Sequence, residues 1–82
     1  MIMVDVKFEG QADPIRDYLI DENFSAKVVA DQILQSADID IKPDALIDLT
    51  SQSILNSAMT LKEQGVKSGN SLLVLYNFST QI

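Results

Sequence analysis

Apolar and polar side chains alternate over the first eight residues of the chain. The apolar positions are Ile2, Val4, Val6 and Phe8. Because successive side chains of a strand point to opposite faces, this pattern predicts a strand over residues 1–8 with one buried face. A second, weaker strand is predicted over residues 15–20, at an edge of the sheet, because Pro14 at its start has no N–H to donate. Either of its faces could be the buried one, and we take Tyr18 and Ile20 as the inward residues.

The clearest apolar stripe follows this pair of strands. Its members are spaced three and four residues apart, at Ala26, Val29, Ala30, Ile33, Leu34 and Ala37. This spacing is that of one face of an α-helix. Ser25 is a good N-cap because its hydroxyl can accept a hydrogen bond from an unpaired backbone N–H, and Pro43 prevents the helix from continuing. The pattern therefore predicts an amphipathic helix over residues 25–37.

Three further strands are predicted after the helix. They cover residues 45–50, 54–55 and 71–76. In the first of them Ile47 and Leu49 alternate with Asp48, which indicates that the two aliphatic residues share a face. If the first and last strands of the chain pair in parallel through a right-handed crossover, they become the central strands. The expected fold is then α+β, a β-grasp in which one helix packs on a mixed sheet of four to five strands.

A spaced motif precedes the last strand and continues into it. Its members are Thr60, Leu61, Gly65, Val66, Gly69, Leu72 and Val74. With the order of the elements, this motif resembles that of ubiquitin-like domains over residues 1–76 and leaves residues 77–82 as a short C-terminal tail. The chain is most similar to the bacterial YukD/EsaB group, which are stand-alone ubiquitin-like proteins encoded beside type VII (ESX-like) secretion systems. The resemblance implies a non-catalytic protein-binding module, an accessory or regulatory factor of such a system.

Composition excludes several kinds of chemistry. The chain has a net charge of −6 and contains neither Cys nor His, so disulfides, the commonest general base and the commonest transition-metal ligand are missing. Scattered basic residues in an acidic chain give no electrostatic footprint for nucleic acid or anionic lipid. No apolar run approaches the length of a membrane span. We expect a cytoplasmic monomer or weak homodimer with no catalytic residue, cofactor, metal or direct membrane insertion.

Other functions of small acidic domains fit less well. A ubiquitin-type modifier or a sulfur carrier needs a C-terminal Gly-Gly, whereas residues 77–82 read Asn-Phe-Ser-Thr-Gln-Ile. Ser71 and Leu72 resemble the site at which acyl carrier proteins take phosphopantetheine, but that serine begins a helix near the middle of a carrier. Ser71 begins a predicted strand eleven residues from the end. A small β-grasp scaffold subunit of a multicomponent enzyme, such as a monooxygenase, remains the main alternative.

The last strand is apolar on both faces. Leu73 and Leu75 alternate with its inward residues, and we expect Met3 and Leu46 to lie on the same outer side of the neighbouring strands. A single helix covers one face of a sheet only, so these four side chains form a candidate partner surface. Central strands are also commonly apolar on both sides for reasons of packing alone. We predict protein binding through Met3, Leu46, Leu73 and Leu75.

Overall fold

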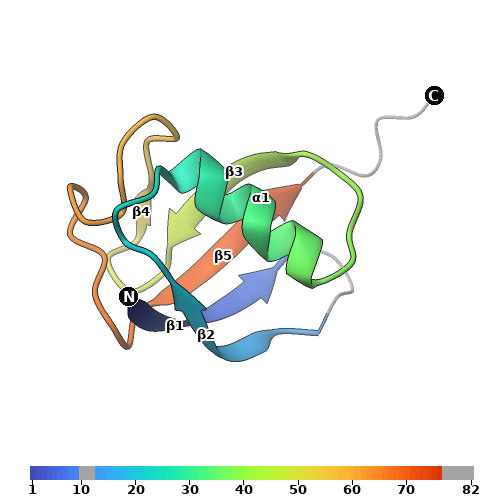
Figure 1. The fold of residues 1–82 in the computed structure, drawn as a ribbon, viewed down its shortest axis with the longest axis horizontal. Coiled ribbons are helices and arrows are strands. Elements are labelled where there is room, and N and C mark those ends of the chain that lie inside the picture. The colour runs from blue at the N-terminus through green and yellow to red at the C-terminus, as the bar shows by residue number, and fades with distance from the viewer. Residues whose placement is uncertain (10–12, 77–82) are drawn as a thin grey trace.

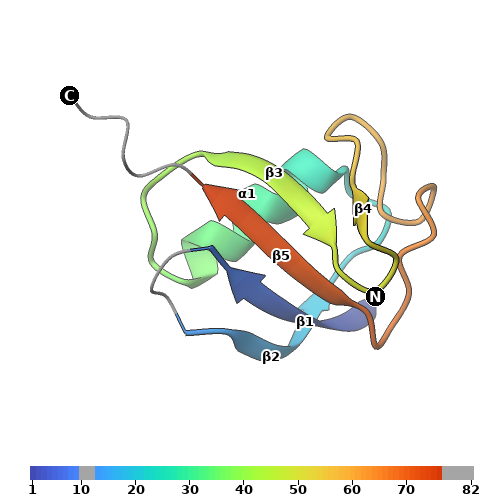
Figure 2. The ribbon, with the colours of Figure 1, turned by 180° about the vertical axis from the view of Figure 1, so that it is seen from behind.

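The computed structural model of the protein describes residues 1–9 and 13–76, so the predicted tail lies outside the described residues. The elements are β1 (Ile2–Phe8), β2 (Ile15–Ile20), α1 (Ala26–Ser36), β3 (Pro43–Asp48), β4 (Ser53–Ile54) and β5 (Ser71–Tyr76). Figure 1 shows α1 lying across one face of the sheet, and Figure 2 shows the opposite face without a helix. The predicted order of elements is confirmed.

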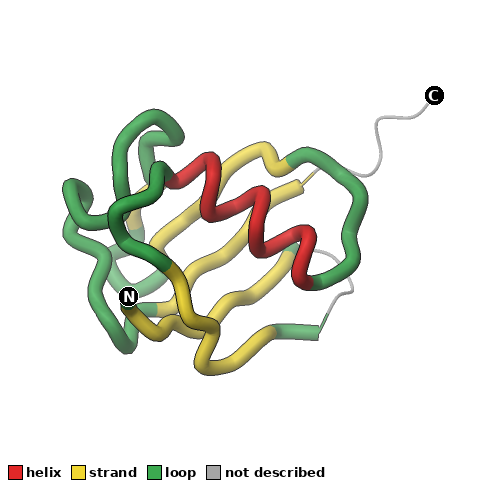
Figure 3. The backbone as a smooth tube through the Cα atoms, viewed as in Figure 1, coloured by secondary structure: helices red, strands yellow, loops and turns green. Residues whose placement is uncertain are grey.

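The strands form one five-stranded sheet in the order β2-β1-β5-β3-β4. β1 and β5 are parallel and central, and each of the other neighbouring pairs is antiparallel. Figure 3 shows the helix packed diagonally over these strands. The mixed sheet with a single covering helix is the β-grasp arrangement expected from the sequence.

The helix begins and ends close to its predicted limits. Ser25 is the N-cap, and its hydroxyl accepts a hydrogen bond from the backbone N–H of Val28 at 3.3 Å. At the other end Asp38 has a φ of 61°, which turns the chain away. The N–H of Ile39 then donates to the carbonyl of Leu34 at 2.9 Å, satisfying one of the carbonyls that a helix end leaves unpaired. The predicted stripe faces the sheet, and its members within α1 are buried.

A β-bulge explains why β2 is hard to read from the sequence. The pairing of β1 with β2 changes register once, leaving β2 with one extra residue at that point. Asp17, in this bulge, has a φ of 56°, and its N–H donates to a carboxylate oxygen of Asp5 at 3.2 Å. The bulge lets both Ile15 and Tyr18 pack against the core. Tyr18 and the buried Ile20 point inward, as predicted.

β3 has the opposite orientation to the one predicted. Leu46 and Asp48 are 3% and 1% exposed and point into the core, whereas Ile47 lies on the side without the helix. The Asp48 carboxylate accepts hydrogen bonds from the backbone N–H of Thr50 at 3.0 Å and the side-chain amide of Asn70 at 3.1 Å. These donors satisfy an acid at a buried position. The prediction that Leu46 faces outward is therefore wrong, because the polar Asp48 does not mark the solvent side.

The segment before β5 is held by a capped turn. The N–H of Thr60 donates to Glu63 Oε1 at 3.0 Å, and the N–H of Glu63 donates back to Thr60 Oγ1 at 3.0 Å. The hydrogen bond from the Thr60 backbone lowers the pKa of the Glu63 carboxyl below its usual value. Gly65, with a φ of +79°, ends the turn, and Val66 then returns to the core. The chain thereby reaches the start of β5.

Gly65→Ala is expected to destabilise the protein by about 1–2 kcal/mol, the cost of the left-handed conformation for a residue with a Cβ. Apart from its two chain neighbours, no residue has an atom within 4 Å of the Cβ position, so the cost comes from the backbone and not from a clash. Each kcal/mol lowers the Tm of a domain of this size by roughly 4–8 °C. Gly65→Asn should cost less, because Asn adopts this conformation more readily. A Tm of Gly65→Ala equal to that of the parent would contradict this.

Candidate protein-binding surface

The open face of the sheet, the side away from α1, carries an apolar patch on β5, β3 and β4. Leu73 lies opposite Ile47, and Ile47 lies opposite Ile54 on its other side. Leu75 lies opposite Ala45. Side chains of directly opposed residues share a face and touch across strands, so these residues form one continuous surface. The apolar patch consists of Ala45, Ile47, Ile54, Leu73 and Leu75.

The members of this patch are partly or fully accessible. Ile54 is 74% exposed at the edge of the sheet, and the others are half-buried by their neighbours. Figure 2 shows that no helix covers the β5 and β3 ribbons from this side. Aliphatic side chains held on a rigid sheet can meet a partner at little conformational cost, because their positions are already fixed. The geometry therefore suits recognition of an apolar surface.

Of the predicted site residues, the structure brings Leu73 and Leu75 together and leaves the other two apart. Met3 is exposed on the same open face, but it lies opposite Leu19 of β2, towards the edge of the sheet away from β3. Lys7, the β1 residue that lies opposite Leu73, is four positions further along β1. At about 3.3 Å per residue, Met3 is roughly 13 Å from that point. Leu46 points into the core, as described above.

Charged side chains border the patch on the β1 side. Lys7 is exposed beside Leu73, and Asp5 precedes it on the same face of β1. Among the described residues the ion pair that forms joins the Met1 amino group to Glu22 at 3.0 Å, and this hydrogen-bonded contact lowers the pKa of the Glu22 carboxyl. Lys7 takes part in no ion pair within the described residues. A partner with an apolar centre and a flanking acid would match both features.

Sequence reasoning missed Ala45, Ile47 and Ile54. The first two were missed because β3 was oriented the wrong way, and the third because a short edge strand gives too little alternation to assign a face. The sequence from Ala45 to Leu49 does show that both faces of this strand carry aliphatic residues: Ala45, Ile47 and Leu49 on one face, and Leu46 on the other. The pairing of Ile47 with Leu73 shows which of these two faces is the open one.

Two other findings concern the part of the chain that the structure describes. It contains no group of three or more Asp, Glu, Cys or His side chains placed to hold a metal ion. None of its helices has the length and apolar character needed to cross a membrane.

Comparison with known proteins places the fold. No family model and no curated protein matches the sequence. Among solved structures, Caldiarchaeum subterraneum ubiquitin is similar with a TM-score of 0.75 and 16% identity, over 98% of both chains. A chain of the MycP5-free ESX-5 inner membrane complex in State II is similar with a TM-score of 0.66 and 21% identity. That match covers 99% of this chain and only 22% of the other. The protein therefore has a ubiquitin-like fold.

Proposed function

We propose that the protein is a non-catalytic ubiquitin-like binding module that serves as an accessory or regulatory factor of a type VII (ESX-like) secretion system. The apolar patch on the open face of the sheet is the observation that carries the binding role. The link to secretion is supported by the resemblance to the YukD/EsaB group and by the structural likeness to a chain of the ESX-5 inner membrane complex.

The centre of the binding surface is the pair formed by Leu73 and Ile47. These residues lie opposite each other on two neighbouring strands, with Lys7 on one side and Ile54 on the other. Binding energy concentrates in a few side chains near the middle of an interface, where water is most completely excluded. Lys7 at the margin adds orientation and association rate more than affinity.

Leu73→Asp is expected to remove most of the binding to a detergent-solubilised type VII inner-membrane complex. Loss of one central apolar residue can cost about 2 kcal/mol, roughly a thirtyfold rise in Kd. The fold should persist because Leu73 is only half-buried on the open face. Biolayer interferometry with the immobilised protein measures the Kd, and circular dichroism on the same sample checks folding.

The matched control is Gln35→Asp, which adds the same charge at an exposed position of α1. Its Kd should equal that of the parent. Undiminished binding by a folded Leu73→Asp variant would place recognition elsewhere, for instance on the exposed helix face around Asp31 and Gln35. If neither the parent nor the control variant binds the complex, the proposed partner is wrong.

A further inference from the structure

The outer edge of β3 is paired over only part of its length. β4 pairs with Ile47 and Asp48, and the N–H of Leu55 donates to the carbonyl of Leu46 at 2.9 Å. Beyond this point no described strand lies beside residues 43–45 on the outer side. A strand edge without a neighbour is a template for another extended chain. The unpaired stretch is roughly 10 Å long at about 3.3 Å per residue.

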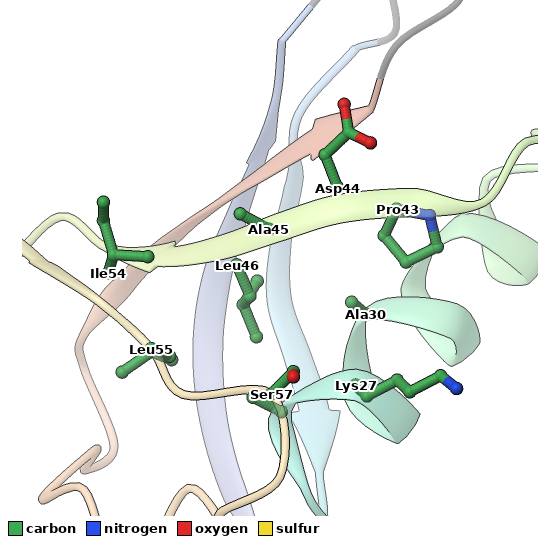
Figure 4. Close-up of a pocket in the computed structure, with 10 residues that line it drawn as sticks. Lys27, Ala30, Pro43, Asp44, Ala45, Leu46, Ile54, Leu55 and Ser57 are labelled. Carbon is green, nitrogen blue, oxygen red and sulfur yellow. The ribbon is translucent and has the colours of Figure 1, made fainter.

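A hollow lies between this edge and α1, as Figure 4 shows. Ala26 and Ala30 line it from the helix, and Leu46 and Leu55 line it from the sheet side. These four side chains are buried in the core and so have fixed positions. Lys27 of α1 also borders the hollow, and space remains there because the two alanines end at a methyl group. A strand added at the edge would place every second side chain into this hollow, which suits small aliphatic residues.

The negative charge at this edge favours a partner segment that carries a basic residue. Asp44 is exposed, and Figure 4 shows its carboxylate pointing away from α1. No ion pair to it forms within the described residues. An added strand would turn its other side chains toward this carboxylate, where a basic residue is favoured. The net charge of −6 for the whole chain acts in the same direction.

A second copy of the chain is a poor occupant. Pairing two β3 edges about a two-fold axis would bring the two Asp44 carboxylates close together, and like charges opposite each other destabilise a strand pair. Both edge strands have an irregularity, at Asp17 in β2 and between Pro43 and Ala45 in β3, but among the described residues the hollow beside α1 adjoins the edge of β3. The hollow is thus what favours the edge of β3 as a binding site, and a segment of another protein is a better occupant than a second copy.

We propose that the outer edge of β3 and the hollow beside α1 accept a short extended segment of a partner protein, with small aliphatic residues in the hollow and a basic residue opposite Asp44. This surface borders the apolar patch and shares Ala45 and Ile54 with it, but it does not include Leu73, Leu75 or Ile47. The edge contact would extend the contact made through the sheet face.

The test is an NMR titration of isotope-labelled protein with a short capped peptide in which lysine and valine alternate. Saturable shift changes should be confined to the amides of residues 44–46 and to Lys27 and Ala30 on the facing side of α1. Asp44→Lys should weaken binding of this peptide roughly fivefold or more and strengthen binding of the matching glutamate–valine peptide. Leu73→Asp should leave the titration unchanged, which separates this proposal from the one for the open face.

Three results would overturn the proposal. The first is the absence of saturable change at residues 44–46. The second is a response centred on β2 or on Leu73 and Leu75, and the third is an equal response of the parent and Asp44→Lys to both peptides. Shift changes at residues 44–46 that grow with protein concentration alone would show instead that a second copy occupies the edge.

Discussion

Ile33→Ala is expected to lower the free energy of unfolding by about 2–5 kcal/mol. Ile33 is fully buried in the middle of the face that α1 turns to the sheet. Truncation loses the transfer free energy of the removed methyl groups and leaves a cavity that the surrounding strands fill only in part. Small domains are stable by roughly 5–15 kcal/mol or less, so this is a large fraction of the total. Urea denaturation should show a lower midpoint with an unchanged slope.

The control for this prediction is the neighbouring residue on the helix. Gln32 is polar and half-exposed, and Gln32→Ala should change the stability by no more than about 0.5 kcal/mol. The two variants shorten adjacent side chains, so they differ mainly in burial. Equal losses would mean that α1 is rotated about its axis relative to the structure described above.

The helix and β1 could be predicted from the sequence because each has an unbroken period over its length. Every apolar position of β1 in the alternating set, from Ile2 to Phe8, is buried, and the predicted stripe of α1 faces the same core. In both elements every buried residue is apolar, although Met3 and Val28 are apolar and exposed. Periodicity is a reliable guide under that condition.

β2 and β3 could be predicted less well because interactions between distant residues override their local pattern. The bulge in β2 depends on the Asp5 carboxylate in another strand. In β3, Asp48 is acceptable inside the core because the backbone N–H of Thr50 and the side-chain amide of Asn70, 22 residues later, both donate to it. Without these partners, the alternation of β3 is read one residue out of phase, and every side chain of the strand is then assigned to the wrong face. No property of residues 45–50 alone reveals these partners.

The candidate surface was predicted in part for the same reason. Leu73 and Leu75 follow from the alternation of β5 alone, which is confirmed, since the alternate residues Leu72 and Val74 are buried. The remaining members of the patch follow from the pairing of β5 with β3. That register depends on tertiary structure, so the sequence identified the central strand of the surface and not its neighbours.

Leu46→Asp is expected to unfold the protein, whereas Ile47→Asp should leave it folded. Leu46 packs among the apolar side chains of the core, where a charge without a partner costs several kcal/mol. That cost is comparable to the whole stability of a small domain. Ile47 is half-buried on the open face, where a carboxylate stays in contact with water. Thermal melting by circular dichroism should show a cooperative transition for Ile47→Asp and none for Leu46→Asp.

The same two variants decide the orientation of β3 and its part in recognition. If Leu46→Asp folds and Ile47→Asp does not, β3 has the orientation that simple alternation predicts, and the patch described here is wrong. If the structure is correct, folded Ile47→Asp should also bind the type VII inner-membrane complex roughly thirtyfold more weakly than the parent, as expected for Leu73→Asp, because the two residues lie opposite each other at the centre of the patch. Normal binding by Ile47→Asp would confine the contact to β5.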